Sequence, residues 1–578
     1  MERPRLRPWP CLGGLFLVAA YARLSEAVVF RSELGKSFLY LSWRESLFWL
    51  SHYLLLLPGL LALAWGISPL VGPWLGRLGQ RFGSAPPKRD RLRLLLYGLL
   101  LFVLAVVGRS LLLLDLPITN DEHTMRFGAQ ILAEGLWMAP DIDPELALTM
   151  PYVYRRDGGI TSMDFPGTLL FKALSLTTGL GQGLFALAVA LSGLALVAAC
   201  GPLDGRRGLA VAAVAWGISP MVATLSLTQH SHLVSRAFVA FAYVVYLRWL
   251  YRNRDGGDLD AGAPRAAVWG LLLGLATACA FLSRPAEAVA VLAPVGIHLA
   301  RLALDRRPLR PLVWAAAAGA ASGPLFTAYY NHQLTGSWRT SARVLANRTM
   351  GDPWWPAVWE RLGENIGFNI MMLILWFLGP LGAVLALLGA TSGRPGARTC
   401  AAAVGLLLAL GFAHSDTGIH LVGPIHYSEA AVPLLILTVL GWGRFVELFT
   451  RLRPPRHAAA TLTAAYLLSL GVWHAVHAGT LVDQALVQRA HLDAVADLDA
   501  AVVVADRPHR LWFLRPEIGA VSSWVAELPH PDPFLRDPVL FAYPEADLDL
   551  LRRRFPDRRL YRMTYAAKGP PVRVEPLD

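Results

Sequence analysis

The sequence predicts a polytopic membrane bundle made mainly of α-helices, followed by a small α/β domain. Of its 578 residues, 55% are hydrophobic and 16% are charged, and the mean hydropathy is +0.44. A helix that crosses the hydrocarbon core of a bilayer needs roughly 20 mostly apolar residues, and such runs recur along most of the chain before residue 477. We therefore divide the chain into a membrane module, residues 1–478, and a soluble extracytoplasmic domain, residues 479–578.

The apolar runs indicate about thirteen membrane spans, because each is long enough to cross most of the hydrocarbon core. Their approximate ranges are 11–30, 47–74, 94–114, 184–200, 209–227, 233–250, 266–282, 288–304, 312–330, 366–388, 401–413, 430–449 and 458–476. The first run has no small-residue cleavage site and is followed by further spans, so we expect a retained helix and not a signal peptide.

The orientation of the bundle follows from its basic residues. With a cytoplasmic N-terminus, every predicted inner loop carries Arg or Lys, as in 77–93, 206–207, 248–265, 301–310, 394–398 and 444–456. The first long outer loop, residues 116–166, has only three basic residues. This asymmetry is the positive-inside pattern of a multi-pass inner-membrane protein. The net charge of +12 is therefore read as membrane topology, and no nucleic-acid partner is expected.

The domain after residue 478 is predicted from short elements that suit a layered α/β fold. Strands are expected in AAVVVA from Ala500 and in PVLFAYP from Pro538, and a helix followed by a strand is expected in DLDLLRRRFPDRRLYRMTY. No catalytic motif is found there.

Unusual polar residues gather in the predicted outer loops. They are Asp121, Glu122, Arg155, Arg156, Asp157, Asp164, His230, His232, Arg236, Arg284, Glu287, Tyr330, Asn331, Arg339, Asp416, His420, His426, Tyr427 and Glu429. Arg284 and Glu287 are the only formal charges between Leu275 and Ala300. Arg284 could merely extend to the membrane surface, but ionisable groups at membrane depth are costly and often functional.

The sequence gives little support for a metal site or for nucleotide-driven chemistry. The histidines of His230-x-His232 lack a third ligand at a clear spacing, so a polar turn is favoured over a metal site. The four cysteines are far apart and form no CxxC pair. Neither a GxGxxG nor a P-loop motif is present, so a nucleotide donor is disfavoured.

A short surface helix is predicted at the start of the first outer loop, in ITNDEHTMRFGAQILAEG from Ile118. Thr119 and Glu122 fit a capping box, in which the Glu122 carboxylate returns to the Thr119 amide. Gly135 is a plausible stop for this helix. The capping box leaves Asp121 unexplained in the first turn, where the helix dipole stabilises a negative charge. A carboxylate at that position could act as a general base.

These motifs, in this order, resemble the C-type glycosyltransferase superfamily (GT-C), and in particular its bacterial branch related to protein O-mannosyltransferases and aminoarabinose transferases. The similar segments are TNDEHTMRFGAQILAEG, MDFPGTLLFKAL, LSRPAEAVAVLAP, YYNHQLTGSWRTS and VGPIHYSEAAVPLLIL. The resemblance implies a GT-C membrane fold over about residues 94–442. It implies that Asp121 is the catalytic base, that Glu122 supports it, and that Asp164 is the second acidic candidate for the catalytic site.

The last of these segments departs from the family pattern, since His426 stands near the place of an arginine that usually contacts the donor phosphate. We therefore expect Arg284 or Arg339 to bind that phosphate, with His426 and Tyr427 as further candidates at the motif itself.

The predicted function is inverting transfer of a sugar from a polyprenyl-phosphate donor to an acceptor on the extracytoplasmic face. The acceptor could be a protein, a glycan or a lipid, and dependence on a divalent metal stays open. A transporter or flippase is the alternative, although such proteins usually hold ionisable residues near the bilayer midplane within related repeats. A noncatalytic assembly scaffold with the same fold is the third reading.

Overall fold

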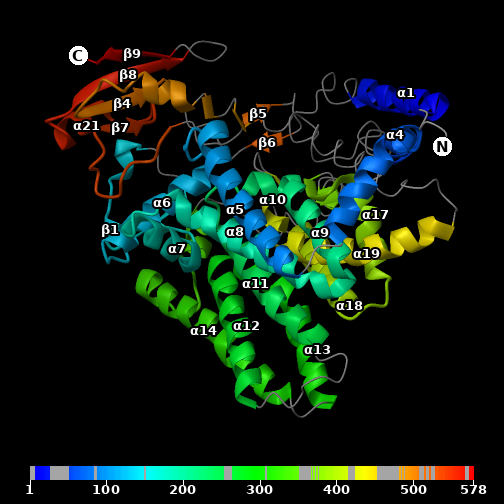
Figure 1. Cartoon of the computed structure of the whole chain (residues 1–578). Coiled ribbons are helices and arrows are strands. Elements are labelled where there is room, and N and C mark those ends of the chain that lie inside the picture. The colour runs from blue at the N-terminus through cyan, green and yellow to red at the C-terminus, as the bar shows by residue number, and fades with distance from the viewer. Residues whose placement is uncertain are drawn as a thin grey trace.

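A computed structural model gives the architecture shown in Figure 1, a helical body with a β-sheet layer over α6 and β1. It describes residues 7–25, 51–83, 87–148, 152–252, 263–305, 309–349, 366, 369–370, 373–374, 376–413, 423–451, 481–482, 485–486, 488–506, 513–515, 520–522, 528–565 and 572–577. The predicted span 458–476 and the loop residues Asp416 and His420 lie outside these ranges.

The helical body contains the elements that the apolar runs predict. Its helices are α1 (Pro8–Ser25), α4 (Leu57–Gly83), α5 (Pro87–Leu112), α8 (Gln182–Ala199), α9 (Gly201–Ile218), α10 (Pro220–Leu225), α11 (Ser231–Arg252), α12 (Ala263–Ser283), α13 (Pro285–Asp305), α14 (Arg310–Thr335), α17 (Gly379–Ala390), α18 (Ala397–Phe412) and α19 (Ala431–Arg451), with short helices η2 (His52–Leu56), α15 (Ala342–Thr349) and η5 (Ile425–Ala430). The mainly α membrane fold is confirmed.

Seven segments of the described residues are long and apolar enough to cross a membrane. They are Leu54–Val71, Asp90–Leu112, Gln182–Ala199, Ser231–Tyr251, Pro264–Ser283, Pro285–Asp305 and Ile425–Leu448. Each overlaps a predicted span, so the chain is a membrane protein.

The predicted span 209–227 is wrong as one continuous helix. It is divided between α9 and α10, and Ser219 between them has an extended backbone with φ −61° and ψ 120°. The cause is Pro220, because a proline disfavours helical backbone in the residue before it and is well suited to the first position of a new helix.

Glycines let two pairs of membrane helices approach closely. A side chain at Gly274 of α12 would collide with the backbone of Ala316 in α14, and one at Gly441 of α19 would collide with the backbone of Leu385 in α17. Small residues replace hydrophobic driving force in such interfaces, because lipid tails are as apolar as the side chains they would exclude.

The first outer loop is ordered around helix α6 (Asn120–Ala133), so the predicted helix is present, but its predicted surface position is wrong because most of its residues are buried. Thr119 is its N-cap, and Gly135 lies just beyond its C-terminal end with φ +76°. The loop continues as an antiparallel sheet of order β1-β3-β2, formed by β1 (Ala139–Pro140), β2 (Val153–Arg156) and β3 (Gly159–Ser162), and ends at helix α7 (Pro166–Thr177). The strands were not predicted.

Near the C-terminus the predicted strands and helix are present. The parallel strands β7 (Val539–Ala542), β4 (Ala501–Ala505) and β8 (Arg559–Tyr565) form a sheet of order β7-β4-β8-β9, in which β9 (Val572–Pro576) pairs antiparallel with β8. Helix α21 (Leu548–Arg554) precedes β8. A separate two-stranded sheet of β5 (Phe513–Arg515) and β6 (Ala520–Ser522) was not predicted.

The C-terminal sheet shares one hydrophobic core with the outer loop. Phe127 and Ile131 of α6 belong to the same buried cluster as Val502 of β4 and Leu540 of β7. An exposed ion pair also crosses this interface, from Arg536 Nη1 to Glu134 Oε1 at 2.8 Å. The buried His123 ring stacks on His530, with centroids 4.8 Å apart. One hydrophobic core therefore spans the predicted boundary at residue 479, while Val503 and Phe541 belong to a separate cluster within the C-terminal region.

Candidate active site

Asp121 stands in the first turn of α6, on the partly exposed side of the helix N-terminus. Its side chain is 26% exposed, and its Oδ2 atom lies 4.0 Å from Nδ1 of His230. The other ring nitrogen of His230 lies 2.9 Å from the hydroxyl oxygen of Thr119. Burial lowers the pKa of His230, although Glu122 and Asp121 oppose that shift. Asp121 thus keeps an accessible carboxylate beside a buried imidazole.

The neighbouring Glu122 is fully buried, and both of its carboxylate oxygens are engaged. Oε1 accepts hydrogen bonds from Arg109 Nη1 at 3.2 Å and from the Gln229 amide at 2.8 Å. Burial alone would raise the pKa of Glu122, but the charge of Arg109 and its neighbours holds that pKa below its ordinary value. Glu122 therefore fastens α6 to α5 and to the loop after α10.

The predicted capping box is half right. The Thr119 hydroxyl accepts the Glu122 amide at 3.3 Å, as expected. The Glu122 carboxylate, however, accepts the amide of Ile118 at 3.0 Å and not that of Thr119. The reason is the buried Arg109, which draws the carboxylate beneath the helix. A supporting role for Glu122 in catalysis is therefore positional, since it has no exposed surface for a substrate.

Lys172 of α7 is a further member of this network that the sequence analysis missed. Its Nζ atom donates to the backbone oxygen of Glu122 at 3.0 Å. Burial lowers the pKa of Lys172 to about 7, although Glu122 opposes the shift. A lone lysine in an apolar run is a signal in the sequence, but its partner becomes known only from the fold.

Asp164, the second predicted acid, comes close to Asp121. It precedes α7, accepts a hydrogen bond from the Ser162 hydroxyl at 2.8 Å, and lies 3.9 Å from Arg343 Nη1. Burial raises the pKa of Asp164 to about 6, and the charge of Asp121 adds to that shift. The two predicted acids therefore interact electrostatically at one site.

Arg284, the preferred phosphate ligand, is buried where α12 meets α13. Its Nε atom donates to Glu287 Oε1 at 3.0 Å, and its Nη2 atom lies 3.3 Å from Nδ1 of His426. Burial opposes the charged form of Arg284, but Glu287, Glu429 and Asp121 together raise its pKa. Among the described residues, none accepts a hydrogen bond from its Nη1 atom.

The other phosphate candidates are less well placed. Arg339 is exposed in the turn after α14, and it is Arg343 that approaches Asp164 and lies over the Phe165 ring at 5.9 Å. Tyr427 is fully buried, and its hydroxyl accepts from Asn369 Nδ2 at 2.6 Å. We therefore do not retain Tyr427 as a phosphate ligand, because packing in the bundle core occupies it.

The histidine pair is divided by the fold. His230 faces Asp121, whereas His232 lies 3.6 Å from Glu429 and comes together with Glu287 and His426. These three residues offer ligand atoms within 4.8 Å of one another, a grouping that the spacing of His230-x-His232 did not predict. In this structure Glu287 and His426 both contact Arg284.

Gly128 fixes the distance between α6 and the rest of the outer loop. A Cβ atom at this position would lie 2.6 Å from Cβ of Ser162 and 3.1 Å from Leu169 Cδ2. We expect Gly128→Ala to lower the free energy of unfolding by about 1–3 kcal/mol through overpacking, measured by thermal unfolding in detergent. Gly183→Ala in α8 is the matched control, since a Cβ there meets no atom within 4 Å. Equal behaviour of the two variants would contradict tight packing at Gly128.

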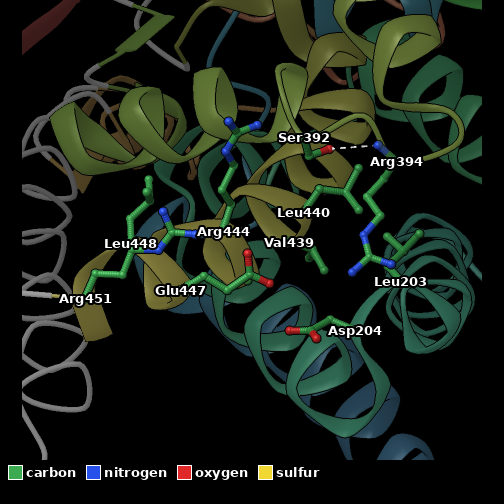
Figure 2. A pocket seen from close by; sticks show the side chains of 11 residues that line it. Leu203, Asp204, Ser392, Arg394, Val439, Leu440, Arg444, Glu447, Leu448 and Arg451 are labelled. Atoms are coloured by element: carbon green, nitrogen blue, oxygen red, sulfur yellow. Dashed lines mark hydrogen bonds between the residues drawn. The ribbon is translucent and has the colours of Figure 1, made fainter.

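A cavity of about 460 Å³ lies at the other end of the bundle and contains none of the predicted site residues. Figure 2 shows Arg394, Arg444 and Arg451 around it, together with Asp204 and Glu447. The lining segments are the first turn of α9, the turn before α18 and the second half of α19. The three arginines belong to predicted inner loops, whereas Val439 and Leu440 belong to the predicted span 430–449.

Comparison with known proteins gives likenesses of fold. No family model matches the chain, and no curated protein matches it. The ArnT structure from Cupriavidus metallidurans bound to undecaprenyl phosphate is 14% identical, with a TM-score of 0.49 over 81% of this chain and 93% of that one. The likeness concerns the fold alone.

Two further solved structures are similar at lower scores. The oligosaccharyltransferase AglB from Archaeoglobus fulgidus, in complex with an inhibitory peptide and a dolichol-phosphate, is 12% identical with a TM-score of 0.36, over 81% of this chain and 69% of that one. The arabinofuranosyltransferase AftD from Mycobacteria is 14% identical with a TM-score of 0.33, over 75% of this chain and 31% of that one.

Proposed function

We propose that this chain is an integral-membrane glycosyltransferase that moves a sugar from a polyprenyl-phosphate donor to an acceptor hydroxyl or amine. The observation that carries the proposal is that two adjacent carboxylates have different environments. Glu122 is buried and bound on both oxygens, whereas Asp121 keeps exposed surface beside a second acid and near a buried arginine. A structural role accounts for Glu122, whereas Asp121 is available to act as the catalytic base.

The proposed reaction is a single displacement with inversion. Asp121 accepts the proton of the acceptor as its oxygen or nitrogen attacks the anomeric carbon. The bond between that carbon and the lipid phosphate oxygen breaks, and polyprenyl phosphate leaves with the bonding electrons. No covalent intermediate between sugar and protein is required.

Arg284 is the proposed ligand of the departing phosphate. Glu287 fixes one edge of its guanidinium, so that the Nη1 edge, from which no described residue accepts a hydrogen bond, is left for phosphate oxygens. Charge-assisted hydrogen bonds of this kind are shorter and stronger than neutral ones. Arg343, which the sequence analysis did not select, is a second cation at the same site through its approach to Asp164.

We place the site on the extracytoplasmic face of an inner membrane. The support is the separation of charge along the bundle, since the arginines around the cavity of Figure 2 come from predicted inner loops at the opposite end. An accumulation of positive residues at one end is the pattern that fixes orientation during insertion.

Deletion of the gene tests the proposed function. Mass spectrometry of proteins, glycans and lipids from the host should reveal one glycoconjugate that lacks a sugar, and expression of the intact chain should restore it. Transport of a solute or lipid by the purified protein in liposomes, with no glycoconjugate changed in the deletion strain, would contradict the proposal.

A pH dependence is expected from Asp164. The raised pKa of about 6 means that this group is ionised at pH 7 and takes up a proton as the pH falls through 6. Its neutral form cannot pair with Arg343 or orient the acceptor as a carboxylate. We expect transfer in isolated membranes to fall about tenfold per pH unit below pH 6, and Asp164→Asn to give a low rate without this limb. An unchanged limb in Asp164→Asn would assign it to another group.

A further inference from the structure

The cavity at the predicted cytoplasmic end of the bundle is built from three separate stretches of chain. Asp204 comes from the start of α9, Arg394 from the turn between α17 and α18, and Arg444, Glu447 and Arg451 from the last turns of α19. Figure 2 shows the side chains of Arg394, Asp204 and Glu447 facing a common space. The sequence predicted the three arginines of the cavity only as part of the positive-inside pattern, and made no prediction for Asp204 or Glu447.

Two of the arginines are held in place by hydrogen bonds, Arg444 through its side chain and Arg394 through its backbone amide. Arg444 donates to the carbonyl and hydroxyl of Thr391, the C-cap of α17, where cations are favoured by the orphan carbonyls of a helix end. Arg394 lies in a tight turn in which its amide donates to the Ser392 hydroxyl at 3.3 Å. Gly393 and Gly396 in this turn have φ of +70° and +81°.

Three arginines, Arg394, Arg444 and Arg451, and two carboxylates, Asp204 and Glu447, line the cavity. Among the described residues, none of the three arginines forms an ion pair within 4.0 Å. Burial also raises the pKa of Asp204, although Arg207 and Arg394 oppose that shift. Arginines without a carboxylate partner in the described residues suit an anionic ligand.

The lining combines arginines with apolar side chains, which favours an anion that carries hydrocarbon. Leu203, Val439, Leu440 and Leu448 form an apolar part of the wall beside the arginines, and Leu448 is 42% exposed. Arginine forks recognise phosphate oxygens in pairs, while an apolar wall suits hydrocarbon. Basic pockets between membrane helices on the cytoplasmic side bind phospholipid head groups for these reasons.

We infer that this cavity is a binding site for a phosphate group, supplied by an anionic phospholipid of the inner leaflet. The phosphodiester would lie between Arg394 and Arg444, and its acyl chains would run along the leucines of α9 and α19. The cavity contains none of the residues proposed for sugar transfer.

Binding can be measured on the purified full-length chain, reconstituted in nanodiscs of phosphatidylcholine with or without phosphatidylglycerol. We expect phosphatidylglycerol to be retained through detergent extraction, as detected by native mass spectrometry, and to raise the midpoint of thermal unfolding. The double variant Arg394→Gln/Arg444→Gln should bind it about tenfold more weakly or worse, since each removes a charge-assisted hydrogen bond. Inorganic phosphate alone, tested in phosphatidylcholine, distinguishes a free anion from a lipid as the source.

Arg398→Gln is the matched control, because Arg398 is an exposed arginine one residue into α18 that does not line the cavity. Gly443→Leu fills the cavity without changing its charge, since a Cβ at Gly443 meets only Asp204, at 3.6 Å, and it decides the matter if the double variant does not fold. Retention of phosphatidylglycerol by Gly443→Leu and the double variant would overturn the inference. An equal loss of phosphatidylglycerol binding in Arg398→Gln would also overturn it, because binding would then depend on surface charge in general and not on the cavity.

Discussion

Asp121→Asn is expected to abolish detectable sugar transfer while leaving the chain folded and inserted in the membrane. Asparagine matches aspartate in size but cannot accept the acceptor proton. General-base catalysis contributes roughly 10²–10⁴-fold to a rate, so the variant should lose activity by about that factor. The measurement is restoration of the missing glycoconjugate in the deletion strain, with the amount of inserted protein determined in the same membranes.

Asp157→Asn is the appropriate comparison for this variant. Asp157 lies in the same outer loop, is exposed in the turn between β2 and β3, and has φ +50°, a conformation that asparagine tolerates. The same chemical change is therefore made where no reaction is proposed, and activity should be kept. Activity retained by Asp121→Asn would remove Asp121 from the role of base.

Glu122→Gln should instead destabilise the packing of α6 against α5 and the loop after α10. The substitution leaves the buried Arg109 without its carboxylate, and breaking a buried ion pair by removing one partner costs about 3–5 kcal/mol. The expected result is a lower midpoint of thermal unfolding in detergent and less inserted protein, at a temperature where Asp121→Asn is still folded. Activity should fall with the folded fraction and not beyond it.

The second half of this prediction is a rescue. Arg109→Leu/Glu122→Leu removes both charges, and such apolar replacements of buried pairs are often close to neutral. Lys172, whose pKa burial lowers to about 7, can release its proton at little cost when the carboxylate is gone. The double variant should therefore be more stable than Glu122→Gln. Additive losses would show that Arg109 and Glu122 do not act as a pair.

The sequence predicts features that depend on local spacing. Helix α6, with Thr119 at its start and Gly135 after its end, follows from capping and periodicity, which involve neighbours in the chain. The hairpin of β2 and β3 had an equally local signal, since Asp157-Gly158 is a typical two-residue turn with positive φ at both positions. It could have been predicted.

The partners of buried charges could not be predicted in the same way. Orientation rules placed Asp121, Asp164 and Arg284 on one side of the membrane, and in the structure their charges interact. That Arg109 pairs with Glu122, and that Arg343 rather than Arg339 approaches Asp164, depends on how helices pack after they are inserted. Tyr427 was selected for its motif, and only the fold shows that Asn369 and the core enclose it.

The core shared by α6 and the C-terminal sheet has a consequence for the timing of folding. Phe127 emerges from the ribosome long before Val502 and Leu540, against which its cluster is packed, and at ordinary rates of synthesis that interval lasts tens of seconds. During it, the segment that carries Asp121 has the caps of its helix but not its full apolar support. Activity should therefore be acquired late, when the strands near residues 502 and 540 reach the outer face.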